Sequence, residues 1–187
     1  MTIKNDKIRI LGKGITALAL KDKFPNATLY DDKDFENYDL QSEELTVVSP
    51  GIPPYNNMVL NSKNVVSDYD LFEDIIPFSI WISGTNGKTT TTQMCQHLLK
   101  EYNSVCGGNI GIPLSHMDEK APIWILETSS FTLHYTNKSK PNIYLLLPIS
   151  EDHITWHGSF KEYQDAKLKP LSLMNENEIA IIPEEFK

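Results

Sequence analysis

The sequence predicts an α/β protein whose sheets are parallel and doubly wound. Two observations support this prediction. Short β-rich runs alternate with helical stretches along the chain, and glycine-rich turns directly follow two of these runs. The chain has 187 residues, of which 40% are hydrophobic, and this is enough for one ordinary core or two small ones. We therefore expect a globular protein.

The first series of elements lies in the N-terminal part of the chain. A short helix, "TALALKDKF", follows the first of three predicted strands, which are "IRILG" (8–12), "ATLYD" (27–31) and "LTVVS" (45–49). Gly12 and Gly14 suggest a dinucleotide-binding turn, but Ala17 stands where a third glycine would come. The residues alone support a generic tight turn and a ligand-binding turn about equally.

A second series of elements begins near residue 79 and also predicts a parallel sheet. Helices are expected from about 88 to 102 and over 159–174, and strands over 79–83, 123–129, 142–148 and 178–183. The acidic turn "FEDIIP" separates the two series, so we place a domain boundary near Ile76-Pro77. The expected units are residues 1–76, a Rossmann-like domain, and residues 77–187, part of a domain of the phosphate-loop type.

The stretch "SGTNGKTTTT" follows the apolar run "SIWI" and predicts a phosphate-binding loop. The strict pattern fails, because Ile82 stands where its first glycine would be. A strand still precedes the loop, and a helix follows whose apolar positions Met94, Leu98 and Tyr102 recur every four residues. A threonine-capped glycine turn would leave the run of β-branched residues unexplained. The candidate residues are Gly84, Thr85, Asn86, Gly87, Lys88, Thr89 and Thr90.

Charge and composition limit the possible partners. The formal net charge of −8 argues against nucleic acid, whose phosphates favour a basic surface. The longest apolar run, Ile143 to Ile149, is far below the roughly 20 residues that span a bilayer, so we expect no membrane partner. Cys95 and Cys106 form no Cys-x-x-Cys pair, and the polar N-terminus does not resemble a secretory leader. We expect a cytoplasmic protein and a monomer.

Polar residues at the ends of predicted strands are candidates for ligand binding. Glu127 and Ser129 end an apolar strand, at the edge where open α/β sheets bind ligands. Beside a phosphate loop, the carboxylate suits a magnesium site, although it could also be a capping glutamate. Asp31 ends an earlier strand and could accept hydrogen bonds from a ribose or a base, or be a solvated loop carboxylate.

The segment "SEDHITWHGSF" contains two histidines four residues apart, His153 and His157. That spacing could indicate zinc, but Gly158 makes a helical pair doubtful, and a lone histidine is usually structural. Lys167 follows on a predicted helix, where lysines are ordinarily solvated. The residues alone leave these alternatives open.

Eight segments, taken in order, resemble the Mur ligase family, and most closely its D-glutamate-adding members. The segments are "GKGITALA" (12–19), "SPGIP" (49–53), "SDYDLF" (67–72), "GTNGKTT" (84–90), "GGNIGIP" (107–113), "LETSSF" (126–131), "EDH" (151–153) and "HGSFKEYQDAK" (157–167). Any one of them is a weak signal, but eight in register are a strong one. The segments "SPGIP" and "GNIGIP" separate these members from their sister ligases better than the shared phosphate loop does.

The resemblance implies roles for individual residues. Gly87, Lys88, Thr89 and Thr90 would hold the phosphates of ATP. Thr89 and Glu127 would bind one Mg²⁺, with Ser129 nearby, and His153 and Lys167 would serve a second, with Lys167 carbamylated by carbon dioxide. Lys88, His153 and Lys167 are therefore the implied catalytic residues. The UDP-sugar would be held by Ile15, Thr16, Asp31 (at the uracil), Gly51 and Asn109, and Ser129 would be a further substrate-binding residue.

The resemblance also implies a reaction. ATP would phosphorylate the terminal carboxylate of UDP-N-acetylmuramoyl-L-alanine, and the amine of D-glutamate would attack the acyl phosphate, in peptidoglycan precursor synthesis. Thr155, Thr132 and Ala17 depart from the usual family residues without removing a proposed phosphate or metal ligand. Family members continue through a third domain, so we expect a truncated chain that is inactive alone. The alternatives are another Mur-type or folate-polyglutamylating ligase, and a nucleotide-binding module without ligase activity.

Overall fold

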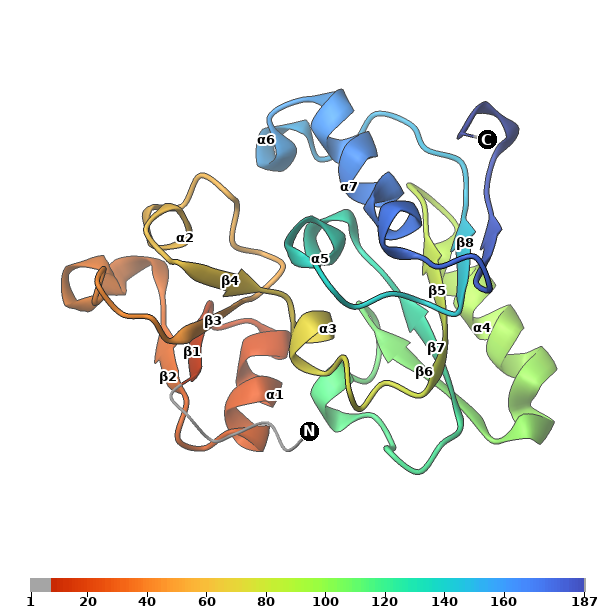
Figure 1. The fold of residues 1–187 in the computed structure, drawn as a ribbon, viewed down its shortest axis with the longest axis horizontal. Coiled ribbons are helices and arrows are strands. Elements are labelled where there is room, and N and C mark those ends of the chain that lie inside the picture. Colours follow the sequence, from red (N-terminus) through yellow and green to blue (C-terminus); the bar gives the residue numbers. More distant parts are fainter. Residues whose placement is uncertain (1–7, 187) are drawn as a thin grey trace.

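The computed structural model describes residues 8–186, except for the side chains of residues 32 and 33, and shows two sheets in which every strand pair is parallel. The predicted α/β class is therefore confirmed. In Figure 1 the first sheet and its helices lie on the left and the second on the right. Within the described residues, no helix is both long and apolar enough to cross a membrane.

The first sheet has four strands in the order β2-β1-β3-β4. Its strands are β1 (Ile8–Leu11), β2 (Thr28–Tyr30), β3 (Leu45–Val48) and β4 (Asn64–Val66). The helices of this part are α1 (Ile15–Lys23), the 3-10 turn η1 (Asp32–Asn37), α2 (Asn57–Leu60) and α3 (Asp68–Leu71). The central strands β1 and β3 are paired neighbours at which the strand order reverses, and open α/β sheets bind ligands at the carboxyl ends of such strands.

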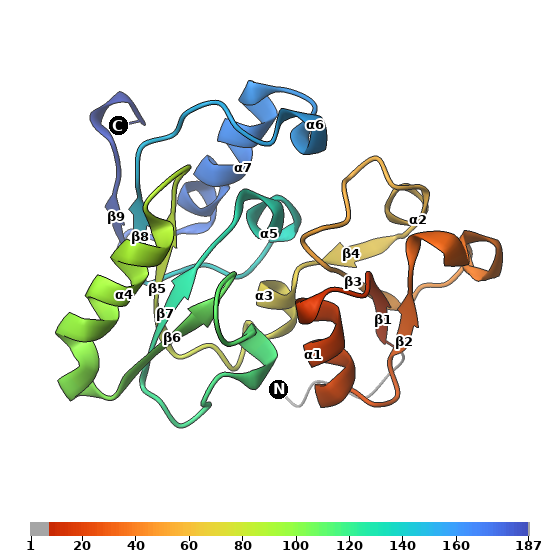
Figure 2. The same ribbon diagram turned by 180° about the vertical axis from the view of Figure 1, so that it is seen from behind.

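The second sheet has five strands in the order β6-β7-β5-β8-β9. Its strands are β5 (Phe78–Ser83), β6 (Ser104–Gly108), β7 (Ile123–Glu127), β8 (Ile143–Leu146) and β9 (Ile179–Ile181). Its helices are α4 (Lys88–Leu99), α5 (Ser130–Tyr135), α6 (Ile154–His157) and α7 (Phe160–Leu173), with 3-10 turns η2 (Lys100–Tyr102), η3 (Leu114–His116) and η4 (Glu184–Phe186). Figures 1 and 2 show α4 on one side of this sheet and α5 and α7 on the other.

One hydrophobic cluster runs through both halves of the molecule. It joins buried residues of the first sheet, such as Ile10 and Val47, to Trp81 and Trp124 of the second. Tyr69 on α3 connects them, because its ring meets Trp81 edge-on with the ring centroids 4.7 Å apart. The predicted boundary at residues 76 and 77 falls in the loop between α3 and β5, and it stays a prediction.

Polar contacts also hold the two halves together. The carboxylate of Asp70 on α3 accepts hydrogen bonds from three successive backbone N–H groups, at 2.7 Å from Asn137 and 2.9 Å from both Lys138 and Ser139. The hydroxyl of Tyr135 donates to the carbonyl of Ile52 at 2.8 Å. These bonds connect α3 and the loop after β3 to α5 and the segment that follows α5.

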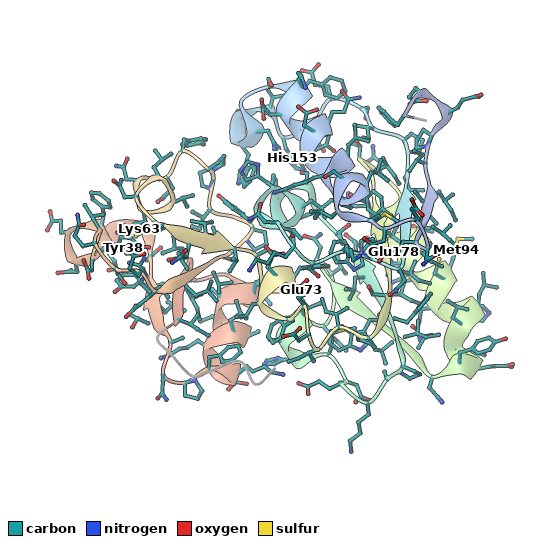
Figure 3. The ribbon with its side chains drawn as sticks, viewed as in Figure 1. Tyr38, Lys63, Glu73, Met94, His153 and Glu178 are labelled. Atoms are coloured by element: carbon teal, nitrogen blue, oxygen red, sulfur yellow. The ribbon has the colours of Figure 1, made fainter. Side chains whose placement is uncertain are left out.

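The helix after the phosphate loop buries a different face from the one its apolar spacing suggests. Met94, Leu98 and Tyr102 are 60%, 73% and 64% exposed, and Figure 3 labels Met94 beside α4. Thr92 is buried instead, and Cys95 packs against a small cluster under the sheet. Small side chains on the inner face let α4 lie close to strands β5, β6 and β7.

Candidate active site

The loop after β5 requires glycine where it turns. Gly84 has a φ of +142°, and a Cβ added there would lie 2.5 Å from the Cβ of Leu147 on the neighbouring segment. Gly87 has a φ of +83° and is the residue before α4 begins. L-residues rarely adopt these φ values, so the two glycines set the path of the loop. The backbone N–H groups at the start of α4 then face outward without helical partners, where an anion can bind.

Lys88 lies over this loop. Its Nζ donates to the carbonyl of Gly84 at 3.0 Å and to that of Thr85 at 2.8 Å. The hydroxyl of Thr85 braces the loop from the other side, because it contacts the Tyr163 hydroxyl at 2.9 Å and donates to the Ser150 carbonyl at 3.1 Å. The segment after β8 and helix α7 thus hold the loop in shape, and the charged amine of Lys88 lies against the carbonyls of the loop.

Three side chains form a chain of hydrogen bonds beside the loop. The hydroxyl of Thr89 donates to Glu127 Oε2 at 2.9 Å, and Asn109 Nδ2 donates to Glu127 Oε1 at 3.0 Å. Glu127 is only 2% exposed. The parallel strands β5, β6 and β7 end at the same edge of the sheet, so they bring these three residues together from distant parts of the sequence.

This arrangement fits a magnesium ion bound partly by the protein. In the described part of the chain, no three His, Cys, Asp or Glu side chains gather as a metal-binding group. Thr89 and Glu127 offer hydroxyl and carboxylate oxygens, the hard ligands that Mg²⁺ prefers. Mg²⁺ usually keeps waters and phosphate oxygens as its other ligands, so two protein oxygens beside a phosphate loop suffice.

Lys167 on α7 is 1% exposed, which corrects the ordinary expectation of a solvated helix lysine. Its Nζ donates to the carbonyl of Gly84 at 2.8 Å and lies 4.9 Å from the centre of the Tyr163 ring. Burial, reinforced by the charge of Lys88, lowers the pKa of Lys167 to about 7. A substantial fraction of the amine is therefore neutral, and nucleophilic, near neutral pH.

The two histidines have different surroundings. His153 immediately precedes the one-turn helix α6, has a positive φ of 52° and packs against Phe131 with the ring centroids 4.7 Å apart (Figure 3). Its ring also lies 6.1 Å from that of Tyr163, the residue that contacts Lys167. His157 is buried, its Nε2 is 3.0 Å from Ser130 Oγ, and burial lowers its pKa to about 4. His157 is therefore a neutral structural residue.

A pocket of about 380 Å³ opens at the carboxyl ends of β1 and β3. Four residues predicted to bind the UDP-sugar line it: Ile15, Thr16, Gly51 and Asn109. Ile15 is 77% exposed, so its side chain is accessible to a ligand in the pocket. The other lining residues are Gly12, Lys13, Gly14, Ser49, Pro50, Ile52, Asp68, Tyr69, Gly108 and Thr132.

Two predicted substrate contacts lie outside this lining. Asp31 pairs with Lys13 at 3.3 Å, and Lys13 in turn lines the pocket, so Asp31 lies just beyond it. Ser129 caps α5, because its hydroxyl accepts from the backbone N–H of Thr132 at 3.1 Å. Their substrate contacts stay predictions. Asp68 and Tyr69 do line the pocket, and no motif singled them out; the only signal was their place within "SDYDLF".

Comparison with known proteins places the chain in a family. The family description "Mur ligase middle domain" matches residues 82–187. A UDP-N-acetylmuramoylalanine--D-glutamate ligase from Campylobacter jejuni is 49% identical over 195 aligned positions, which cover 95% of this chain and 48% of the relative. The chain therefore spans about half the length of the curated relatives it matches.

Solved structures with low identity share the fold. The crystal structure of UDP-N-acetylmuramate:L-alanyl-gamma-D-glutamyl-meso-diaminopimelate ligase from Neisseria meningitidis superposes with a TM-score of 0.56 at 13% identity, covering 95% of this chain and 71% of that one. A MurF ligase from Thermotoga maritima in complex with ADP gives 0.51 at 18% identity, covering 94% and 42%. With the family description matching more than half of its length, the chain belongs to the Mur ligase family.

Proposed function

We propose that this chain carries the parts of a ligase that bind UDP-N-acetylmuramoyl-L-alanine and the phosphates of ATP. The ligase adds D-glutamate to the alanine carboxylate through an acyl phosphate. Relatives named for this reaction share close to half of their aligned residues with the chain. The pocket at the first sheet receives the UDP-sugar, and the loop at residues 84–90 receives the ATP phosphates.

The position of Asn109 supports the proposal independently of the similarity to the family. Asn109 lines the pocket and also donates its amide N–H to Glu127, which bonds Thr89 at the phosphate loop. A substrate in the pocket therefore ends within reach of the phosphate edge. This juxtaposition brings a carboxylate close to the γ-phosphate, as transfer between them requires.

The loop residues then act on the phosphoryl group. Lys88 exchanges its bonds to the loop carbonyls for bonds to phosphate oxygens, and the N–H groups at the start of α4 bind the same anion. Thr89 and Glu127 would hold one Mg²⁺, and His153 with Lys167 would hold a second. Bound there, the metal ions neutralise charge on the phosphates.

Lys167 becomes an anionic ligand if carbon dioxide adds to its amine. The neutral Nζ forms the N–C bond and loses a proton, which leaves a carbamate in place of a cation. The pKa of about 7 makes the reacting neutral form available. Monomeric state and cytoplasmic location stay predictions.

Calorimetric titration of the 187-residue chain tests the proposed function. We expect UDP-N-acetylmuramoyl-L-alanine to bind at one site, and UDP-N-acetylglucosamine to bind at least about tenfold more weakly because it lacks the lactoyl-alanine arm. Binding of ATP together with no measurable binding of either UDP-sugar would instead identify a nucleotide-binding module without this substrate.

A further inference from the structure

Asp68 is a buried carboxyl group in the lining of the substrate pocket. It is the first residue of α3, directly after the capping residue Ser67, and it is 7% exposed. The pocket that it lines also contains the turn after β1, Gly51 and Asn109. Apart from its place in the pocket, nothing in the proposed reaction uses it.

The surroundings of Asp68 disfavour a negative charge. Its carboxyl group accepts hydrogen bonds from two backbone N–H groups, that of Tyr69 (3.1 Å to Oδ1) and its own, and these favour the charged form. The ion pairs among the described residues include none to Asp68, so burial outweighs the two bonds. Burial raises its pKa to about 7, and the nearby charge of Asp70 adds to the shift. A buried carboxyl without a counter-ion favours its neutral form.

The other charged groups around the pocket do not supply that counter-ion. Glu127 lies behind Tyr69, whose hydroxyl donates to the Glu127 carbonyl at 3.4 Å. Lys13 is the cation of the lining, and it pairs with Asp31 at 3.3 Å and Asp34 at 3.9 Å. A diphosphate entering the pocket would add more negative charge.

We propose that Asp68 is a substrate-binding residue of this pocket, which as a neutral carboxylic acid donates a hydrogen bond to an oxygen of the bound sugar nucleotide. This inference rests on the proposed function. An ionised Asp68 would repel the diphosphate in a pocket of about 380 Å³, whereas the acid form offers an O–H donor. Binding above pH 7 therefore requires uptake of a proton, and affinity falls by about tenfold per pH unit there.

The test is calorimetric titration of the full 187-residue chain with UDP-N-acetylmuramoyl-L-alanine between about pH 6 and pH 8.5. We expect wild-type affinity to be constant at low pH and to fall above pH 7. Asp68→Asn keeps an N–H donor and cannot ionise, so its affinity should match wild type at pH 6 and exceed it by about thirtyfold at pH 8.5. Asp68→Ala should bind about tenfold more weakly at pH 6 and show no decline. Asp74→Asn, an exposed change in the same segment, should keep the wild-type profile.

The outcomes separate the two proposals. Wild-type chain that binds no UDP-sugar overturns the proposed function and this inference with it. If the wild-type chain binds normally and both Asp68 variants keep its dependence of affinity on pH, the inference alone is overturned. Weak binding of Asp68→Asn at every pH also overturns it, because an ionised carboxylate would then be accepting a hydrogen bond from the substrate. Circular dichroism of each variant confirms that it is folded.

Discussion

The carboxyl edges of the two sheets are built differently. At the second sheet, Lys88 donates to two carbonyls of the loop, Thr89 donates to Glu127, and the path of the loop depends on glycine. At the first sheet, the edge is an open pocket lined by backbone and by exposed side chains such as Ile15. This contrast supports the proposal that one edge binds an anion in a preformed loop and that the other recognises a substrate.

Under the proposed function, the difference matches what each edge would bind. Phosphates are alike in every nucleotide, so a fixed loop with one cation serves them well. A sugar nucleotide is recognised by its shape and by a few polar groups, so the pocket is wider and mixes apolar with polar lining. Asn109 lines the pocket and donates to Glu127 at the other edge, so under the proposed function one substrate would reach from the pocket to the phosphate loop.

Replacing Lys88 with Ala should have the largest effect, and it should affect ligand binding at one edge only. The variant loses the cation at the phosphate loop, so we expect MgATP to bind about 100-fold more weakly, or roughly 3 kcal/mol. UDP-N-acetylmuramoyl-L-alanine should bind within about twofold of wild type, because Lys88 does not line the pocket. Calorimetry measures both affinities, with Lys100→Ala, an exposed lysine beyond α4, as the control. An equal loss for both ligands would show that the edges are not separate sites.

Replacing Lys167 with Met should remove a chemical signal and keep the fold. Methionine fills a similar volume in the buried site but has no amine. With ¹³C-bicarbonate, NMR should show a carbamate resonance in the wild-type chain and none in Lys167→Met. Lys161→Met, a change to an exposed lysine on the same helix, should keep the resonance. A signal that persists in Lys167→Met would assign the carbamate elsewhere.

Replacing Asp70 with Ala should have the smallest effect. It removes contacts between α3 and the segment after α5, which connect the two halves of the molecule. Three backbone N–H groups lose their acceptor, and water can replace it in part because these groups are partly exposed. We therefore expect the free energy of unfolding to fall by about 1–3 kcal/mol. Urea denaturation measures the change, with the exposed Asp74→Ala as the matched control. Equal midpoints for the two variants would mean that the Asp70 contacts do not hold the halves together.

Sequence patterns predicted the fold class and the glycine-dependent turn between β5 and α4 because both depend on local signals. Alternating apolar runs identified most of the strands, and the loop is marked by Gly84 and Gly87, which the backbone geometry requires. Strand β6, "SVCGG", was missed because Val105 is its one β-branched or large apolar residue. Its glycines are needed for packing: a Cβ on Gly107 would lie 2.4 Å from Met117 Sδ.

Burial of polar groups was harder to predict. The buried state of Lys167 and Asp68 depends on tertiary packing around single residues, which periodicity does not reveal. The apolar spacing of Met94, Leu98 and Tyr102 suggested a helix face that the structure leaves exposed. The spacing of apolar residues identifies a helix. It does not show which face of the helix packs on the sheet when small side chains allow the helix to lie close to the strands.

The most direct test of two separate binding edges is NMR of the isotope-labelled 187-residue chain, titrated in turn with each ligand. UDP-N-acetylmuramoyl-L-alanine should shift the backbone amides of Gly12, Gly14 and Gly51, and MgATP should shift those of Gly84 and Gly87. Asn109 should respond to both ligands. If both ligands shift the same glycines, or if the UDP-sugar leaves Gly12, Gly14 and Gly51 unmoved, the assignment of one substrate to each edge is wrong.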